Sequence, residues 1–143
     1  MPVALGAKAE QVVPTMVDAM LARDGQAWAD SLGGLSSQEI SAVMSAAFAA
    51  AVYRRWPEDP SLEEIAGYAT SLSSAPGEKV VVAASTIEAG IRAALGEMEM
   101  LNGISAEDRV PAYLLVIHAI QDDGVLGSHN RDEYVAEIID AVA

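Results

Sequence analysis

The side chains best suited to chemistry lie close together in the last quarter of the chain. His118 stands four residues before Asp122, so both can share one face of a helix, and His129 and Glu133 follow in the next loop. Imidazoles beside carboxylates form acid–base pairs and many metal sites. His118, however, lies in an apolar run, where a histidine hydrogen-bonded to a neighbouring group is the commoner arrangement. We therefore interpret His118 as structural and keep His118, Asp122 and Glu133 as polar-site candidates only.

The segment from Asp122 to Glu133 has the length of an EF-hand calcium loop, twelve residues, and lies between two expected helices. It matches that loop at the first position with Asp122, at the sixth with Gly127 and at the twelfth with Glu133. Positions three and five are Gly124 and Leu126, which carry no side-chain oxygen. The sequence therefore predicts no calcium site, and no other segment predicts a metal or a cofactor.

Two segments resemble known families. Asp123-Gly124 followed by Asp132-Glu133 resembles the acidic Asp-Gly loops of the TerB-like tellurite-resistance family, in which such a loop leads into a helix, although the spacing here is longer. The run from Phe48 to Pro57, followed by Ser61-Leu-Glu-Glu-Ile-Ala, is similar to small uncharacterised helical proteins of actinobacteria. The second resemblance covers about the middle third of the chain. It implies a bacterial, all-helical protein and brings no known activity.

Composition excludes several classes of function. With no cysteine, the chain has no thiolate nucleophile, no Cys-ligated zinc and no iron–sulfur cluster. No nucleophile-elbow glycine pattern surrounds any serine or threonine, so we expect no enzyme. The net charge of −13 argues against nucleic acid and anionic membranes as partners. The apolar runs are too short to span a bilayer. The N-terminal residues do not have the pattern of an export signal, so we expect a cytoplasmic protein.

Apolar periodicity predicts one all-α domain over residues 1–143, a bundle or orthogonal array of five to seven helices. Capping boxes fix three helix starts: Ser36 with Glu39, Ser61 with Glu64, and Asn130 with Glu133. Asp108 is the expected cap of a helix that has Pro111 in its first turn. Glycines at 90 and 96 indicate close helix contacts. The expected helices span residues 10–23, 26–32, 37–56, 62–72, 79–101, 110–120 and 131–142.

The helix over 37–56 is expected at the centre of the domain. Its apolar stripe, which includes Phe48, repeats at three and four residues without a break. Its other side carries only alanine and serine, which lets a second layer of helices approach closely. At its end, Tyr53-Arg54-Arg55-Trp56 gathers cations and aromatics. Arginine there suits the helix dipole. The alternative is an interface anchor formed by Arg54, Arg55 and Trp56.

We expect a non-enzymatic protein that acts through protein–protein contact. More than half of the residues are hydrophobic, so we also expect a homodimer. Its predicted interface is the apolar face of the last helix, with Tyr134, Val135, Ile138 and Ile139, and Val17 and Met20 of the first helix are candidates to extend it. Two other functions stay open: an acidic antagonist of a basic partner, of the immunity-protein or DNA-mimic type, and a small-molecule or metal-binding bundle.

Overall fold

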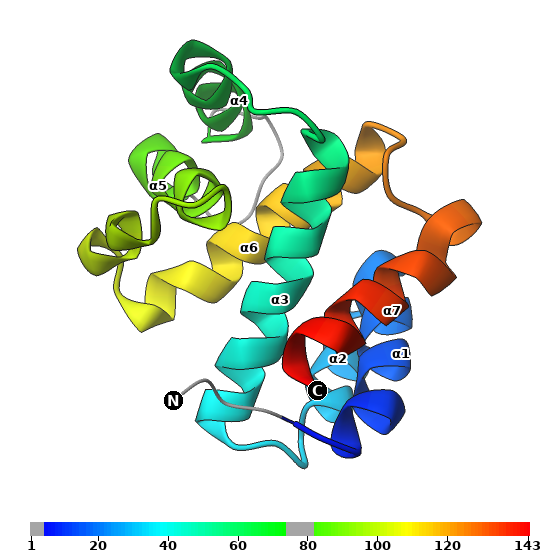
Figure 1. Ribbon diagram of the computed structural model, residues 1–143. Coiled ribbons are helices and arrows are strands. Elements are labelled where there is room, and N and C mark those ends of the chain that lie inside the picture. Colours follow the sequence, from blue (N-terminus) through cyan, green and yellow to red (C-terminus); the bar gives the residue numbers. More distant parts are fainter. Residues whose placement is uncertain (1–4, 74–81) are drawn as a thin grey trace.

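The computed structural model describes residues 5–73 and 82–143, apart from the side chain at position 106, and these residues form an all-α fold (Figure 1). No strand occurs in them, which confirms the predicted fold class. None of the described helices is long and apolar enough to cross a membrane. The elements are α1 Lys8–Leu21, α2 Gly25–Ser31, α3 Ser37–Arg55, α4 Leu62–Ser73, α5 Ala84–Ala94, the 3-10 helix η1 Met98–Gly103, α6 Ala106–Asp122, the 3-10 helix η2 Ser128–Asn130 and α7 Arg131–Val142.

Helices α3 and α6 cross at the centre of the molecule (Figure 1). On one side α1, α2 and α7 pack together, and α7 contacts α3. On the other side α4 packs against α5, which in turn contacts α6 and η1. Buried apolar side chains from both sides form one continuous hydrophobic cluster within the described chain. The central position expected for the helix over 37–56 is therefore confirmed.

Local capping chemistry explains two of the helix starts. The hydroxyl of Ser36 accepts a hydrogen bond from the Glu39 amide at 3.1 Å, and the Glu39 carboxylate accepts one from the Ser36 amide at 2.9 Å. These bonds hold the pKa of Glu39 below its usual value, and Lys8 lowers the same pKa further. At α4 the Ser61 hydroxyl accepts from the Glu64 amide at 3.1 Å. The full capping box predicted with Ser36 is confirmed, and at α4 the Ser61 hydroxyl forms the first of the two predicted bonds.

The start of α6 differs from the prediction. The N-cap is Ser105, three residues before the expected cap Asp108, and Ser105 Oγ donates a hydrogen bond to Asp108 Oδ2 at 2.9 Å. Pro111 consequently lies inside α6 and not in its first turn. Its side chain is exposed, so water can solvate the carbonyl that loses its helical partner. The prediction was wrong because it took Asp108 as the cap and Pro111 as a first-turn residue, whereas Asp108 lies within the first turn and Ser105 precedes it as the N-cap.

The long helix expected over residues 79–101 is also wrong. Residues 79–81 lie outside the described chain, and the rest divides into α5 and η1. Gly96 has φ +124°, a conformation that L side chains rarely adopt, so it interrupts the helix and makes no close helix contact. Gly90 fulfils the expectation, because a Cβ placed there would lie 3.6 Å from Phe48 Cζ and 3.8 Å from a ring carbon of Tyr113.

These two glycines give a matched pair of substitutions. Gly96→Ala should lower the free energy of unfolding by about 1–2 kcal/mol, because alanine is strained at positive φ. Gly90→Ala should leave stability unchanged or raise it by up to about 1 kcal/mol, because the added methyl meets ordinary van der Waals contacts within a helix. Urea unfolding of both variants tests this. A Gly96→Ala variant as stable as the parent would contradict the assigned backbone break.

Candidate functional site

The polar-site candidate His118 serves to hold two helices together. Its Nε2 lies 3.0 Å from the carbonyl oxygen of Met20 at the end of α1. One turn further along α6, Gln121 Nε2 donates a hydrogen bond to the carbonyl of Leu21 at 2.9 Å. Carbonyls in the last turn of a helix lack helical partners, so α6 supplies partners for the end of α1. This is the structural role expected for His118.

Asp122, the second candidate, completes the same junction from the opposite direction. Arg23 follows α1 with φ +58°, the one positive φ of a non-glycine residue in the described chain. Its Nη2 donates to Asp122 Oδ1 at 2.6 Å and to the His118 carbonyl at 3.1 Å. A left-handed arginine costs backbone energy, and these two contacts with α6 offset that cost. The ends of α1 and α6 therefore cap each other.

A hollow of about 80 Å³ lies beside this junction. Pockets for small molecules commonly measure about 300–1,000 Å³, so this hollow has room for little more than one side chain or a few waters. Arg23 and His118 at its wall already contact neighbouring helices. The lining residues are Ala19, Met20, Arg23, Asp24, Gly25, Trp28, Leu114 and His118.

The carboxylates of the loop 122–133 point to different partners and do not converge. Asp122 pairs with Arg23, whereas Asp123 accepts from Arg55 Nε at 3.1 Å. Glu133, the third candidate, is exposed and lies 3.5 Å from Arg54 Nη2. No group of three or more histidine or carboxylate side chains suited to a metal gathers within the part of the chain that is described. Although this loop has the length of an EF-hand loop, its carboxylates do not gather around one point where a cation could bind.

Asn130 does not form the capping box predicted with Glu133. Its Oδ1 accepts from the Gly127 amide at 2.9 Å, and its Nδ2 donates to the Val125 carbonyl at 2.7 Å. No side-chain hydrogen bond caps α7 at this residue. The prediction was wrong because the asparagine amide is already used within the preceding loop, where the short helix η2 brings those backbone groups into reach.

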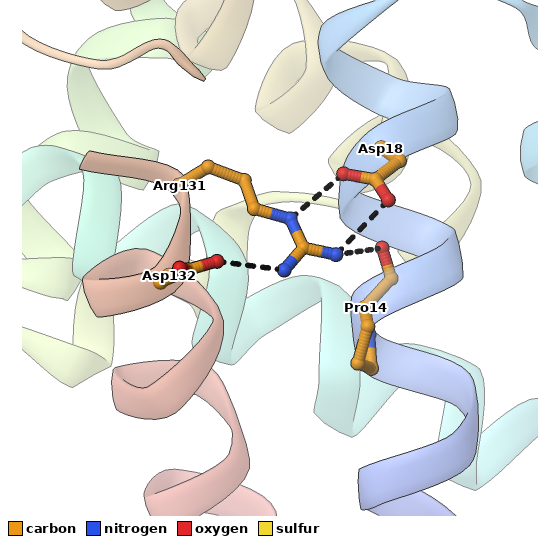
Figure 2. Close-up of polar contacts among 4 residues, drawn as sticks. All are labelled: Pro14, Asp18, Arg131 and Asp132. Atoms are coloured by element: carbon orange, nitrogen blue, oxygen red, sulfur yellow. Dashed lines mark hydrogen bonds and ion pairs between the residues drawn. The ribbon is translucent and has the colours of Figure 1, made fainter. Parts of the chain in front are cut away.

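The start of α7 is held by an arginine instead (Figure 2). Arg131 binds both carboxylate oxygens of Asp18 on α1, through Nε at 2.8 Å and Nη2 at 2.9 Å. Its Nη1 donates to Asp132 at 2.9 Å, and Nη2 lies 3.4 Å from the Pro14 carbonyl. The hydrogen bonds to Asp18, followed by those to Asp132, raise the pKa of Arg131 above its usual value. This bidentate pair fixes α7 against α1.

The predicted interface anchor at the end of α3 is largely internal. Trp56 is 4% exposed and packs edge to face on Tyr68 of α4, with ring centroids 5.0 Å apart. The Arg55 guanidinium lies 5.1 Å from the Trp56 ring and 5.5 Å from the Tyr68 ring. Burial, and then the Asp123 carboxylate, raises the pKa of Tyr68 well above its usual value. The alternative interpretation of Arg54, Arg55 and Trp56 as an interface anchor is wrong for Trp56, because this side chain joins α3 to α4 within the chain.

The dimer face predicted on the last helix is part of the hydrophobic core. Tyr134 and Ile138 are fully buried, Val135 is 6% exposed and Ile139 is half-buried. The Tyr134 hydroxyl donates a hydrogen bond of 2.7 Å to the Ala47 carbonyl of α3, and burial raises the pKa of that hydroxyl. Helices α1 and α3 cover this face. The assignment of this face to a dimer is therefore wrong.

A wider groove lies between α3 and α7, with a volume of about 440 Å³. Its floor is made of alanines from both helices. Tyr53, 54% exposed, stands among the lining residues, where Arg54 Nη2 also binds Glu137 Oε1 at 2.6 Å. The small side of α3 was expected to admit a second layer of helices, yet part of it stays open. The lining residues are Ala46, Ala49, Ala50, Tyr53, Arg54, Glu137 and Ala141.

Every cationic side chain in the described chain has an internal partner. Lysine at 8 and arginines at 23, 54, 55, 92 and 131 form ion pairs with carboxylates. Arg109 donates to the carbonyls of Leu101 and Ile104. Many carboxylates have no such cation. Those without an ion pair among the described residues are Glu10, Asp24, Asp30, Glu58, Asp59, Glu63, Glu64, Glu88, Glu99, Glu107, Asp108 and Asp140.

No family model matches this chain, and no match was found among curated proteins or solved structures. The functional interpretation of this chain therefore depends on the geometry of its described residues. Among the described residues, that geometry includes a small hollow at the α1–α6 junction and an open groove between α3 and α7. The α1–α6 junction brings the candidates His118 and Asp122 together with Arg23, whereas the groove combines alanines with Tyr53, Arg54 and Glu137.

Proposed function

We propose that this protein acts by binding another protein that presents a basic surface, and that it is not an enzyme. The observation that carries the proposal is the balance of charges. The cationic side chains among the described residues all bind groups within the chain. A large set of carboxylates forms no ion pair there and can face solvent or a partner. Such a surface attracts positively charged proteins and repels nucleic acid and anionic lipids.

The polar candidates favour binding over catalysis. His118, Asp122 and Glu133 each contact a different neighbour in the helix junctions. A general acid or base must reach a substrate proton within hydrogen-bond distance, and the hollow beside His118 is smaller than a typical substrate pocket. The same two observations weigh against a small-molecule or metal site at the α1–α6 junction. Cytoplasmic location and self-association stay predictions from the sequence, the latter without an assigned face.

Antagonism of a basic partner is the second candidate. The exposed carboxylates Glu58, Asp59, Glu63 and Glu64 follow one another around the start of α4, and Leu62 between them is 59% exposed. A local concentration of negative charge favours masking of a nuclease or nucleic-acid-binding surface. The remaining unpaired carboxylates are spread over most of the other helices, so simple protein binding is the better supported of the two functions.

The test is capture followed by binding with purified components. Proteins retained by the immobilised chain from a lysate of its source organism would be identified, expressed and titrated by calorimetry at low and high salt. We expect a partner with a basic surface whose affinity falls about tenfold or more when salt screens the contact. Failure of every purified candidate to bind at tens of micromolar would contradict the proposal. Loss of the partner's nucleic-acid binding in the complex would identify an antagonist.

A further inference from the structure

We propose that the groove between α3 and α7 binds a single basic amphipathic helix of the partner protein. This inference rests on the proposed function and names the place and the shape of the contact. A helix that lays its apolar face into a groove is a recurrent mode of recognition between proteins. The charges and side-chain sizes around this groove select that occupant over the others.

The floor of the groove is suited to a helix. Ala46, Ala49 and Ala50 recur on one side of α3, and Ala141 faces them from α7. Small side chains let two helix axes approach closely, and the large apolar side chains of an incoming helix then fill the space above the alanines. The groove volume of about 440 Å³ accommodates a few such side chains. Tyr53, exposed at the groove, offers a broad amphipathic contact.

The charge of the α7 wall selects a basic helix. Glu137 lines the groove, and Glu133, one helical turn earlier, lies beside the same Arg54; their side chains are 48% and 77% exposed. Asp140, one turn further along α7 and outside the lining, is exposed and has no ion pair among the described residues. Among the described lining residues Arg54 is the only cation, but its side chain is 15% exposed and both glutamates hold it. Lysine or arginine beside the apolar face of an incoming helix would complement this wall.

A second copy of the chain is a poorer occupant. Each copy carries a net charge of −13, so self-pairing across this groove would bring acidic walls together. The apolar face of α7 that a two-fold dimer was expected to use is already buried in the core. A basic partner helix meets neither obstacle.

The probe is a synthetic peptide of about 15–20 residues, long enough for helix formation, with leucines on one face and lysines beside them. A scrambled peptide of equal composition and an acidic peptide serve as controls. We expect saturable binding of the basic amphipathic peptide, by fluorescence anisotropy, at least about tenfold tighter than either control. Amide chemical-shift changes should centre on α3 and α7.

Paired variants locate the site. Ala50→Leu fills the floor and should weaken peptide binding about tenfold or more, whereas Ala29→Leu, at an exposed position of α2, should leave it unchanged within twofold. Glu137→Gln should weaken binding several-fold at low salt. Its control Glu63→Gln makes the same charge change on α4, which does not pack against α7. Circular dichroism verifies that each variant is folded, and Glu137→Gln carries the test alone if Ala50→Leu fails to fold.

The outcomes separate this inference from the proposed function. Binding of the basic peptide no better than the scrambled one, or binding that neither Ala50→Leu nor Glu137→Gln weakens, would overturn the assignment of the groove. If a purified partner binds the Ala50→Leu and Glu137→Gln variants as well as the parent, the protein-binding function stands and the groove is wrong. If no purified candidate binds the parent, the proposed function itself fails.

Discussion

Ile138→Glu should prevent the chain from folding. Ile138 lies on the face of α7 that α1 and α3 cover, and its side chain is fully buried. A glutamate at this position would place a carboxylate in the apolar core. A buried charge without a partner costs several kcal/mol, or the group must take up a proton to remain there. Domains have total stabilities of about 5–15 kcal/mol. We therefore expect a loss of more than about 4 kcal/mol, or no folded protein.

Ala136→Glu provides the matched control on the same helix. Position 136 is exposed, so the added carboxylate stays in water, and repulsion from Asp132 and Asp140 at four residues' distance should keep the loss of stability below about 1 kcal/mol. Thermal unfolding followed by circular dichroism would compare the two variants with the parent. An Ile138→Glu variant that melts like the parent would show that α7 packs differently from the arrangement described above.

The position of Ile138 also defines what an amphipathic pattern can establish. The spacing of Tyr134, Val135 and Ile138 predicts that one face of the last helix is buried, and this is confirmed. The pattern does not identify what covers that face, since a second copy and the rest of the chain bury the same side chains equally well. Here α1 and α3 cover it, with a hydrogen bond from Tyr134 to the Ala47 carbonyl.

Local capping signals succeed where the capping side chain is not already bound by another backbone group. Ser36 and Glu39 complete each other's hydrogen bonds within one turn, so the sequence predicts the start of α3 correctly. Asn130 carries a similar signal, but its amide is bound to Gly127 and Val125. The helix expected over residues 79–101 was likewise predicted from periodicity alone. That pattern does not show that Gly96 adopts a positive φ, which interrupts the helix.

The helix junctions could not be predicted from the sequence. Arg23 with Asp122 and Arg131 with Asp18 are each separated by about a hundred positions along the chain, so no local spacing links them. Such pairs emerge only when α1, α6 and α7 pack together. The sequence indicates the groove only indirectly, because the small residues on the outer side of α3 predict the close approach of another helix. That signal does not tell whether the approaching helix belongs to this chain or to a partner.

Phe48→Ala should be the most damaging truncation of an aromatic side chain on α3. Phe48 is 3% exposed and stacks on Tyr113 of α6, with ring centroids 4.3 Å apart and planes inclined by 16°. The backbone of Gly90 on α5 closes against the same ring. Removing it leaves a cavity where three helices meet, and buried Phe→Ala changes cost about 3–5 kcal/mol. The protein should remain helical but unfold at a lower urea concentration.

Tyr53→Ala is the control for this prediction, since it removes an aromatic ring from the same helix at a site that is 54% exposed. Its loss should stay below about 1 kcal/mol, although it should weaken binding of the basic helical peptide at the groove. The comparison separates the two sides of α3: the Phe48 side stabilises the fold and the Tyr53 side is available to a partner. A loss below about 1 kcal/mol for Phe48→Ala, measured by urea unfolding, would mean that the contact of α3 with α5 and α6 is not the centre of the core.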